Sequence, residues 1–202
     1  MARQLLKEYQ ELRCSERGCA DMLNEQEKSL VQQGFMLFPA KLQEADSKNG
    51  NGRVYPRKIL EREVQKYQAL IADNSAVGEL SHPDNSEIDP NNISHKIVRM
   101  FWQGNDVLGI VQVLKGHPKG TMLEALYNNN VKFGFSSRAL GSLKENVNGT
   151  GPDIVQEDLD LICFDAVINP SAPGAYVLRE SQQTKEKRLE TLFESIIRTK
   201  TR

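Results

Sequence analysis

Two apolar segments on either side of a short polar turn constrain the fold of this chain more than any other feature. Residues 97–102 and 107–114 consist largely of β-branched, aliphatic and aromatic residues, and Gln103-Gly104-Asn105-Asp106 lies between them. Strand-forming residues around such a turn are typical of a β-hairpin. The pattern therefore predicts an antiparallel hairpin in the middle of the chain.

Further strands and helices are predicted around this hairpin. Strands are expected at residues 34–39, 131–140 and 159–168, and helices at 1–32 (interrupted near Gly18), 57–72, 121–129 and 182–200. In the helix at 57–72, apolar residues recur at three- and four-residue spacing, and Pro56 is placed at its first position. Because strands and helices are mixed without a regular β–α–β rhythm, the sequence favours a mainly β, α+β fold with peripheral helices.

Composition excludes several function classes. The 202 residues include 26 Lys and Arg against 27 Asp and Glu, a net charge of -1, which argues against a strongly basic nucleic-acid-binding domain. No apolar run is long enough for a transmembrane helix, and the polar start of the chain is unlike a signal peptide. The three Cys are irregularly spaced, which fits a reducing compartment. Neither zinc-ligand spacing nor a phosphate-binding glycine loop occurs in the sequence, so no metal or cofactor is expected.

The segment Lys132-Phe133-Gly134-Phe135-Ser136-Ser137-Arg138 carries a candidate nucleophile. Side chains alternate between the two faces of a strand, so Ser136 shares a face with Gly134 and Arg138, away from the aromatic residues. A small neighbour and nearby hydrogen-bond donors suit a serine that attacks a carbonyl. The alternative is an edge strand with two solvated serines.

A candidate base lies in Gly78-Glu79-Leu80-Ser81-His82-Pro83. A residue before proline is restricted to an extended backbone, which would present the His82 imidazole from a fixed position. The alternative is a histidine in a surface loop. Of the other two histidines, His117 is expected to be solvated in its loop, whereas His95 directly precedes a predicted strand and stays a reserve candidate.

One carboxylate interrupts the apolar run Leu161-Ile162-Cys163-Phe164-Asp165-Ala166-Val167-Ile168. Because burying an unpaired carboxylate is unfavourable, Asp165 requires a partner, and orienting a catalytic imidazole would be one such role. A structural ion pair or a turn cap is the alternative. Cys163 in the same run is expected to be a small core residue and not a nucleophile.

Motifs in a fixed order along the chain resemble the prohead core proteases of large tailed phages. They are Asn51-Gly52-Arg53-Val54-Tyr55-Pro56, Gly78-Glu79-Leu80-Ser81-His82-Pro83, Phe101-Trp102-Gln103-Gly104-Asn105-Asp106-Val107, Gly134-Phe135-Ser136-Ser137-Arg138-Ala139-Leu140-Gly141-Ser142, Asp165-Ala166-Val167 and Pro170-Ser171-Ala172-Pro173. Each motif alone is weak, but together they cover about residues 34–180. The sequence departs from the family at Ala139, where a glycine is usual.

The resemblance implies a fold like that of herpesvirus assemblin, a small β barrel surrounded by helices. It also implies a catalytic His and Ser, which map onto His82 and Ser136. The third catalytic residue varies among related proteases; Asp165 is the first candidate and His95 the reserve. Backbone N–H groups near Arg138, with its guanidinium close by, and Ser137 are expected at the oxyanion and substrate side.

The activity implied by the resemblance is that of a serine endopeptidase of head maturation. Such an enzyme would cut scaffold or core proteins and major capsid proteins after Glu in Leu/Ile-x-Glu motifs, inside the assembling prohead in the host cytoplasm. Self-association is left open, and neither nucleic acid nor membrane is an expected partner. Matching motifs in this chain make Glu180, Glu194 and Glu8 candidates for self-cleavage.

The chain is accordingly divided into a charged helical arm (1–33), a protease domain (34–180) and a charged helical tail (181–202) removed by self-cleavage. The terminal segments are interpreted either as docking the enzyme among scaffold proteins, as holding a zymogen inactive, or as simple solvated helices. Two further functions stay open. One is a non-catalytic scaffold or head-assembly protein that retains the protease fold, and the other is a small-molecule hydrolase that uses the same Ser and His.

Overall fold

The computed structural model describes residues 4–10, 22–146 and 151–168. The strands are β1 (Gln4–Gln10), β2 (Leu37–Glu44), β3 (Arg53–Val54), β4 (Val77–Glu79), β5 (Ile93–Gln103), β6 (Asp106–Val113), β7 (Gly134–Gly141), β8 (Leu143–Lys144), β9 (Asp153–Val155) and β10 (Asp160–Val167). The helices are α1 (Glu25–Gln32), α2 (Arg57–Ala72) and α3 (Pro118–Asn128). This strand-rich arrangement confirms the predicted α+β class.

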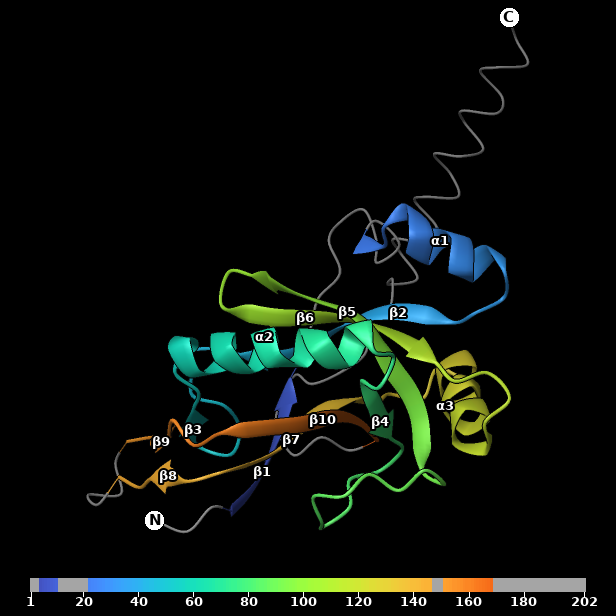
Figure 1. The fold of residues 1–202 in the computed structure, drawn as a ribbon. Helices are drawn as coiled ribbons and strands as arrows, with labels where there is room; N and C mark the ends of the chain where they lie inside the picture. The colour runs from blue at the N-terminus through green and yellow to red at the C-terminus, as the bar shows by residue number, and fades with distance from the viewer. Residues whose placement is uncertain (1–3, 11–21, 147–150, 169–202) are drawn as a thin grey trace, which may run out of the picture.

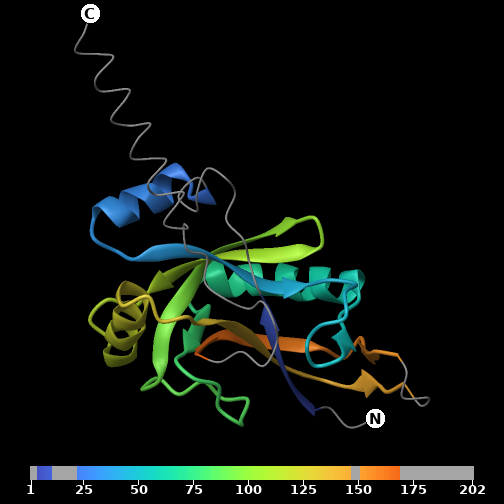
Figure 2. The ribbon, with the colours of Figure 1, turned by 180° about the vertical axis from the view of Figure 1, so that it is seen from behind.

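The strands of the described residues form three sheets, in the orders β1-β7-β10, β2-β6-β5-β4 and β3-β9-β8. No closed barrel joins them into one ring of hydrogen bonds within this part of the chain. In Figure 1, α2 lies across the front of the molecule between the β5–β6 hairpin and β10, and α3 packs at one end of the same hairpin. Figure 2 shows β1 and β2 on the side opposite to α2. The helices thus lie around the sheets, as predicted.

A parallel bridge between Leu80 and Ala166 connects the edge of the β2-β6-β5-β4 sheet, at β4, to the edge of the β1-β7-β10 sheet, at β10. The backbone N–H of Ser81 strengthens this connection by donating to the carbonyl of Ala166 at 2.8 Å. The bridge directly follows β4 and lies next to Asp165 on β10. The loop that begins at His82 therefore starts beside the carboxylate of Asp165.

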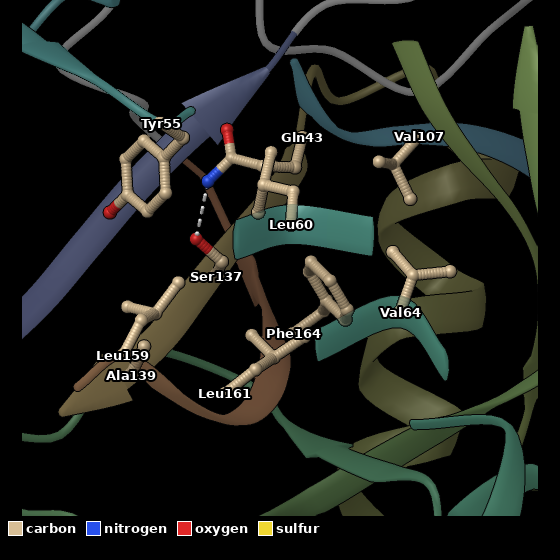
Figure 3. A pocket seen from close by; sticks show the side chains of 10 residues that line it. All are labelled: Gln43, Tyr55, Leu60, Val64, Val107, Ser137, Ala139, Leu159, Leu161 and Phe164. Carbon is tan, nitrogen blue, oxygen red and sulfur yellow. Dashed lines mark hydrogen bonds between the residues drawn. The ribbon is translucent and has the colours of Figure 1, made fainter. Parts of the chain in front are cut away.

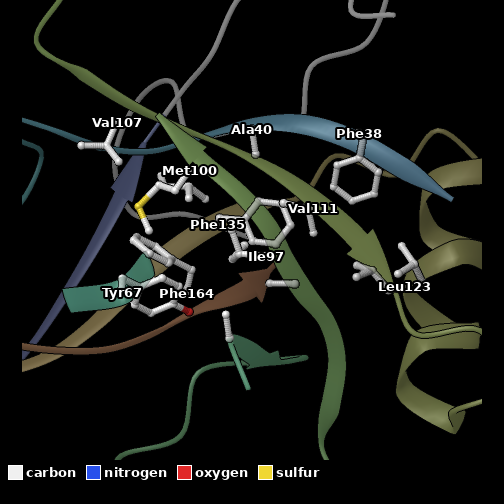
Figure 4. Packing of buried hydrophobic residues seen from close by; sticks show 14 of the residues in the cluster. Phe38, Ala40, Tyr67, Ile97, Met100, Val107, Val111, Leu123, Phe135 and Phe164 are labelled. Carbon is white, nitrogen blue, oxygen red and sulfur yellow. The ribbon is translucent and has the colours of Figure 1, made fainter. Parts of the chain in front are cut away.

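The main core fills the space between the β1-β7-β10 sheet, the β2-β6-β5-β4 sheet, α2 and α3 (Figure 4). Phe135 of β7 and Phe164 of β10 point into it, and Tyr67 of α2 meets Phe164 edge to face at a ring distance of 5.4 Å. Each large apolar side chain buried in this way contributes about 1.5–3 kcal/mol. Because strand side chains alternate, this packing turns the neighbouring residues of β7 and β10, Ser136 and Asp165, towards the other face.

The hairpin and the long helix follow the sequence predictions. β5 and β6 form the hairpin with Gly104 at a positive φ of 60° in the turn, and β5 begins four residues before the predicted strand. α2 has the predicted bounds and buries the apolar face formed by Ile59, Leu60, Val64 and Tyr67. Pro56 is the N-cap of this helix and not its first residue.

The predicted helix at 1–32 is wrong for residues 4–10, which form β1. This segment pairs antiparallel with β7 along its whole length, and hydrogen bonding to that edge outweighs the weak preference of its residues for a helix. α1 occupies Glu25–Gln32 of the predicted helix. The helix predicted at 182–200 lies outside the described residues, and the boundaries of the arm, protease domain and tail stay predictions.

Several bounds differ because they depend on tertiary contacts. β2 starts later than predicted and continues to Glu44, because its whole length pairs with β6. α3 starts at Pro118, where the His117 side chain caps it by accepting from the N–H of Lys119. The short strands β3, β4, β8 and β9 are not predicted from the sequence. Among the described helices, none has the length and apolar character needed to cross a membrane.

Candidate active site

Ser136 and Asp165 are direct partners in the antiparallel pairing of β7 with β10. Side chains opposite each other in such a pair lie on the same face of the sheet. The His82 ring lies between them: its Nε2 is 3.1 Å from Ser136 Oγ, and its Nδ1 is 2.6 Å from Asp165 Oδ2. The structure therefore brings together the three residues that the sequence analysis names as Ser, His and acid.

The tautomer of His82 follows from its two neighbours. The Asp165 carboxylate can accept but not donate, so the proton of the neutral ring belongs on Nδ1, and Nε2 is free to accept from the Ser136 hydroxyl. The His82 side chain is 7% exposed, and the residue before it, Ser81, has a φ of 81°. A non-glycine residue in this region is strained, and such strain is common where a chain must present a functional side chain.

The Asp165 carboxylate is completely buried and surrounded by donors. Its Oδ1 accepts from the backbone N–H of Glu79 at 3.1 Å and from Arg138 Nη2 at 3.1 Å, and Arg138 Nε lies 3.0 Å from Oδ2. Burial alone would raise the pKa of Asp165, but the His82 hydrogen bond, the Arg138 charge and the Glu79 N–H outweigh it and hold that pKa below its ordinary value. The group is thus kept ionised next to the imidazole.

The Arg138 guanidinium is not directed where the sequence analysis expects it. It is completely buried, and its nitrogens contact Asp165, Glu79, the Cys163 sulfur and the carbonyls of Asn85 and Glu87. A buried cation without carboxylate partners would be strongly unfavourable, which accounts for its place beside two acids. These contacts direct the guanidinium to the Asp165 carboxylate and the loop after His82, and not to an oxyanion position beside Ser136.

Ser137 occupies the opposite face of β7 from Ser136. Its Oγ accepts from Gln43 Nε2 at 3.1 Å, and both side chains line an apolar cavity between β7, β10 and α2 (Figure 3). The Ser137 side chain, expected on the substrate side, therefore points into the interior and away from Ser136. Strand alternation predicts this division from the sequence.

His95, the reserve candidate for the third catalytic residue, hydrogen-bonds to Ser94 and Phe164 and not to His82. It is completely buried, with Nδ1 2.9 Å from Ser94 Oγ and Nε2 2.9 Å from the carbonyl oxygen of Phe164. Burial lowers the pKa of His95 to about 4, and the Asp165 charge and the Phe164 hydrogen bond oppose this only in part. The ring is therefore neutral at ordinary pH and connects β5 to β10.

The candidate cleavage site at Glu8 lies in β1. The pairing register sets Glu8 opposite Ser137 and Tyr9 opposite Ser136, so the Glu8–Tyr9 peptide bond runs beside the strand that carries the candidate nucleophile. Ser136 itself is completely buried in this structure. The other two candidates, Glu180 and Glu194, lie outside the described residues.

Glu79 is a buried acid of the candidate site for which no role was predicted from the sequence. It is 1% exposed, and its Oε1 accepts from the N–H of Asp89 at 2.6 Å and lies 3.4 Å from Arg138 Nη2. The signal for it was present, because an acid within Val77-Gly78-Glu79-Leu80 needs a partner in the same way as Asp165 does. Among the described residues, no cluster of three or more His, Cys, Asp or Glu side chains is arranged to hold a metal ion.

Comparison with known proteins agrees with the resemblance seen in the motifs. The family model described as "Prohead core protein serine protease" matches residues 17–186. The prohead core protein protease of Enterobacteria phage T4 is 40% identical over 137 residues, which are 66% of this chain and 64% of that protein, so the match spans less than two thirds of the relative. The solved structure of gp21, the capsid assembly protease of bacteriophage T4, superposes with a TM-score of 0.69 at 31% identity, covering 84% of this chain and all of that one. The chain therefore belongs to the prohead core protein serine protease family.

Proposed function

We propose that this chain is a serine endopeptidase of head maturation, which cuts scaffold or core proteins and capsid proteins after Glu in Leu/Ile-x-Glu motifs. The observation that carries the proposal is the hydrogen-bonded series from Ser136 Oγ through His82 to Asp165, with distances of 3.1 and 2.6 Å. Family membership supports the same reading. The substrates, and the assembling prohead in the host cytoplasm as the place of action, follow from the family and are part of the proposal.

The proposed reaction is acyl transfer in two halves. His82 Nε2 takes the proton from Ser136 Oγ while that oxygen attacks the main-chain carbonyl carbon of the Glu, and the protonated ring is stabilised by Asp165 at its Nδ1. The same proton then passes to the leaving amine as the C–N bond breaks, which leaves an acyl-serine. Water repeats the sequence with His82 as base, releases the acid product and restores the serine.

The oxyanion would be held by backbone N–H groups near Arg138. β7 lies between β1 and β10, so its backbone groups on the β1 side are occupied as long as β1 stays paired. An extended substrate that added to this edge as a strand would replace β1. This route needs β1 to leave, and the complete burial of Ser136 agrees with a resting state that is closed to substrate.

Self-cleavage after Glu8 would supply that change, and we propose it together with trimming of the tail after Glu180 or Glu194. Cutting the Glu8–Tyr9 bond shortens the strand that pairs beside Ser136 and so weakens its hold on β7. The intact mass of the wild-type chain should fall by the mass of these terminal segments, whereas Ser136→Ala should keep its full mass. Leu143-Lys144-Glu145, a matching motif in the exposed part of the domain, provides an internal reference for cleavage by chance.

The activity test uses a peptide with a Leu-x-Glu sequence and a fluorophosphonate probe on the full chain. Ser136→Ala should reduce cleavage by at least about 10³-fold, because the nucleophile itself is removed. Ser137→Ala is the matched control on the same strand, and it should retain cleavage and labelling. Cleavage that survives in Ser136→Ala would overturn the assignment. A folded wild-type chain that neither cleaves nor labels, even when it is produced without residues 1–8 and 181–202, would favour the non-catalytic head-assembly protein.

A further inference from the structure

Arg138 contacts the three chain segments that build the candidate site. It extends from β7, two residues beyond Ser136, and reaches Asp165 on β10. It also reaches Glu79 at the end of β4 and the carbonyls of Asn85 and Glu87 in the loop that begins at His82. One side chain thus connects the strand of the nucleophile, the strand of the acid and the loop of the base.

Arg138 approaches both oxygens of the Asp165 carboxylate, one through a hydrogen bond and the other as an ion pair. Arg138 Nε lies 3.0 Å from Oδ2, and Nη2 donates to Oδ1 at 3.1 Å. The Nε–H itself donates to Cys163 Sγ at 3.3 Å, and the two close approaches together restrict the position of the carboxylate. The oxygen that meets Nε is Oδ2, which is also the oxygen that accepts from His82 Nδ1 at 2.6 Å. The guanidinium therefore determines where this oxygen lies relative to the imidazole.

The remaining nitrogen of the fork holds the loop after His82. Arg138 Nη1 donates to the carbonyls of Asn85 at 3.2 Å and Glu87 at 2.9 Å. Glu79 holds the same loop from the other side, because its Oε1 accepts from the N–H of Asp89 at 2.6 Å and lies 3.4 Å from Arg138 Nη2. Asn85 and Glu87 are themselves exposed, and these carbonyl contacts tie their backbone to the interior.

We propose that Arg138 is a positioning residue, which holds the Asp165 carboxylate and the His82 loop in register and does not touch the substrate. The inference rests on the proposed protease activity. The Arg138 and Asp165 side chains are completely buried and Glu79 is 1% exposed, so the guanidinium also supplies the cation that two neighbouring buried acids need. Lysine cannot replace it, because an ammonium group lacks the planar fork that contacts both carboxylate oxygens and two carbonyls at once.

The test is a double-mutant cycle on kcat for a Leu-x-Glu peptide. Arg138→Lys should lower kcat by about 10²-fold and change KM by less than about 2-fold, and Asp165→Asn alone should lower kcat by about 10⁴-fold. Because Arg138 acts through Asp165, adding Arg138→Lys to Asp165→Asn should lower kcat by less than about 3-fold more. A guanidinium that touched the oxyanion would instead give losses that multiply, and this result would overturn the inference.

Arg99→Lys is the control for losing an arginine fork outside the candidate site, on a side chain that is 32% exposed. Arg99 contacts both oxygens of Glu27, at 2.6 and 2.8 Å, and links β5 to α1 without contact to the candidate site residues. This variant should keep kcat within about 2-fold of wild type.

If Arg138→Lys does not fold, Glu79→Gln tests the same arrangement, since it keeps the side-chain shape and removes one carboxylate. It should lower kcat about 10-fold, again without a further loss in the Asp165→Asn background. A wild-type chain without activity speaks against the proposed function. An active wild type whose folded Arg138→Lys and Glu79→Gln variants keep full kcat speaks against this inference alone.

Discussion

Ser136 and Asp165 lie opposite each other on neighbouring strands, and the His82 ring occupies the space between their side chains. The spacing of an antiparallel pair thus determines the relative positions of the nucleophile and the acid, whereas the base extends from a loop. The loop is fixed at its start by the Leu80–Ala166 bridge and beyond His82 by Arg138. A relay built in this way depends on the β7–β10 register, since a slip by one residue would turn either side chain into the core.

Replacement of the two candidate third residues should give opposite results. Asp165→Asn keeps the shape but removes the charge that stabilises protonated His82, so kcat should fall by about 10⁴-fold with little change in KM. His95→Gln should keep kcat within about 3-fold and instead lower the free energy of unfolding, because His95 connects β5 to Phe164 of β10. Steady-state kinetics and urea unfolding on the same preparations measure both effects. A large kcat loss in folded His95→Gln would return His95 to the catalytic set.

Local sequence patterns predict most residues of the candidate site, but not which of them contact one another. Alternation along Phe133–Arg138 separates Ser136 from Ser137, and the lone acid in an apolar run marks Asp165 as a residue in need of partners. Which partners it has depends on the pairing of β7 with β10 and on the bridge at Leu80, contacts between segments far apart in sequence. Arg138 shows this best, since its predicted face of the strand is correct but its contacts could not be derived from the strand alone.

The long elements of the fold could be predicted from the sequence, whereas β1 and the short strands could not. The hairpin of β5 and β6 and the helix α2 follow from periodicity, because both are long and strongly patterned. β1 was not predicted, because its seven residues have no alternation of their own and become a strand through the free edge of β7. The two- and three-residue strands are likewise products of the packing around them.

Stability should fall as pH is lowered from 6.5 towards 4, because of His95. The unfolded imidazole binds a proton below its ordinary pKa of 6.5, whereas in the folded protein burial holds the pKa of His95 at about 4. The unfolded state therefore binds more protons between pH 6.5 and pH 4. The contribution of His95 to the free energy of unfolding is complete above pH 6.5 and is lost as the pH falls to 4. Between pH 7 and pH 5 the loss from this residue is about 2 kcal/mol.

Urea unfolding at pH 7 and pH 5 measures this loss, with His95→Gln as the reference that should lose about 2 kcal/mol less between the two values. Asp165 has a lowered pKa as well, but its contribution disappears only below its ordinary value of 3.8 and so lies outside the compared range. Equal pH dependence in wild type and His95→Gln would show that the ring is protonated without cost in the folded protein.

Gly78 should tolerate no side chain. A Cβ at this position would collide with the carbonyl oxygen of Phe164 and lie 2.5 Å from His95 Nε2, because β4 passes close to the contact between these two residues. Gly78→Ala should therefore destabilise the protein by about 3 kcal/mol or more and separate β4 from β10. Gly104→Ala is the matched control: its Cβ would meet no atom within 4 Å, and only its positive φ of 60° is unfavourable, at about 1 kcal/mol. Similar losses in the two variants would contradict the close approach at β4.

Removing the Tyr67 hydroxyl should not weaken the fold. Among the described residues, this oxygen is a buried side-chain atom without a hydrogen-bond partner, and the side chain is 1% exposed. Burial, with the charges of Cys163 and Asp165 as smaller contributions, raises the pKa of Tyr67 well above its ordinary value, so the hydroxyl stays neutral. A buried polar group without a partner is unfavourable by about 1–3 kcal/mol, and phenylalanine keeps the ring that packs on Phe164. Tyr67→Phe should hence leave the free energy of unfolding unchanged or raise it by about 1 kcal/mol, and keep kcat. A loss of more than about 1 kcal/mol in urea unfolding would show that the hydroxyl has a partner in solution.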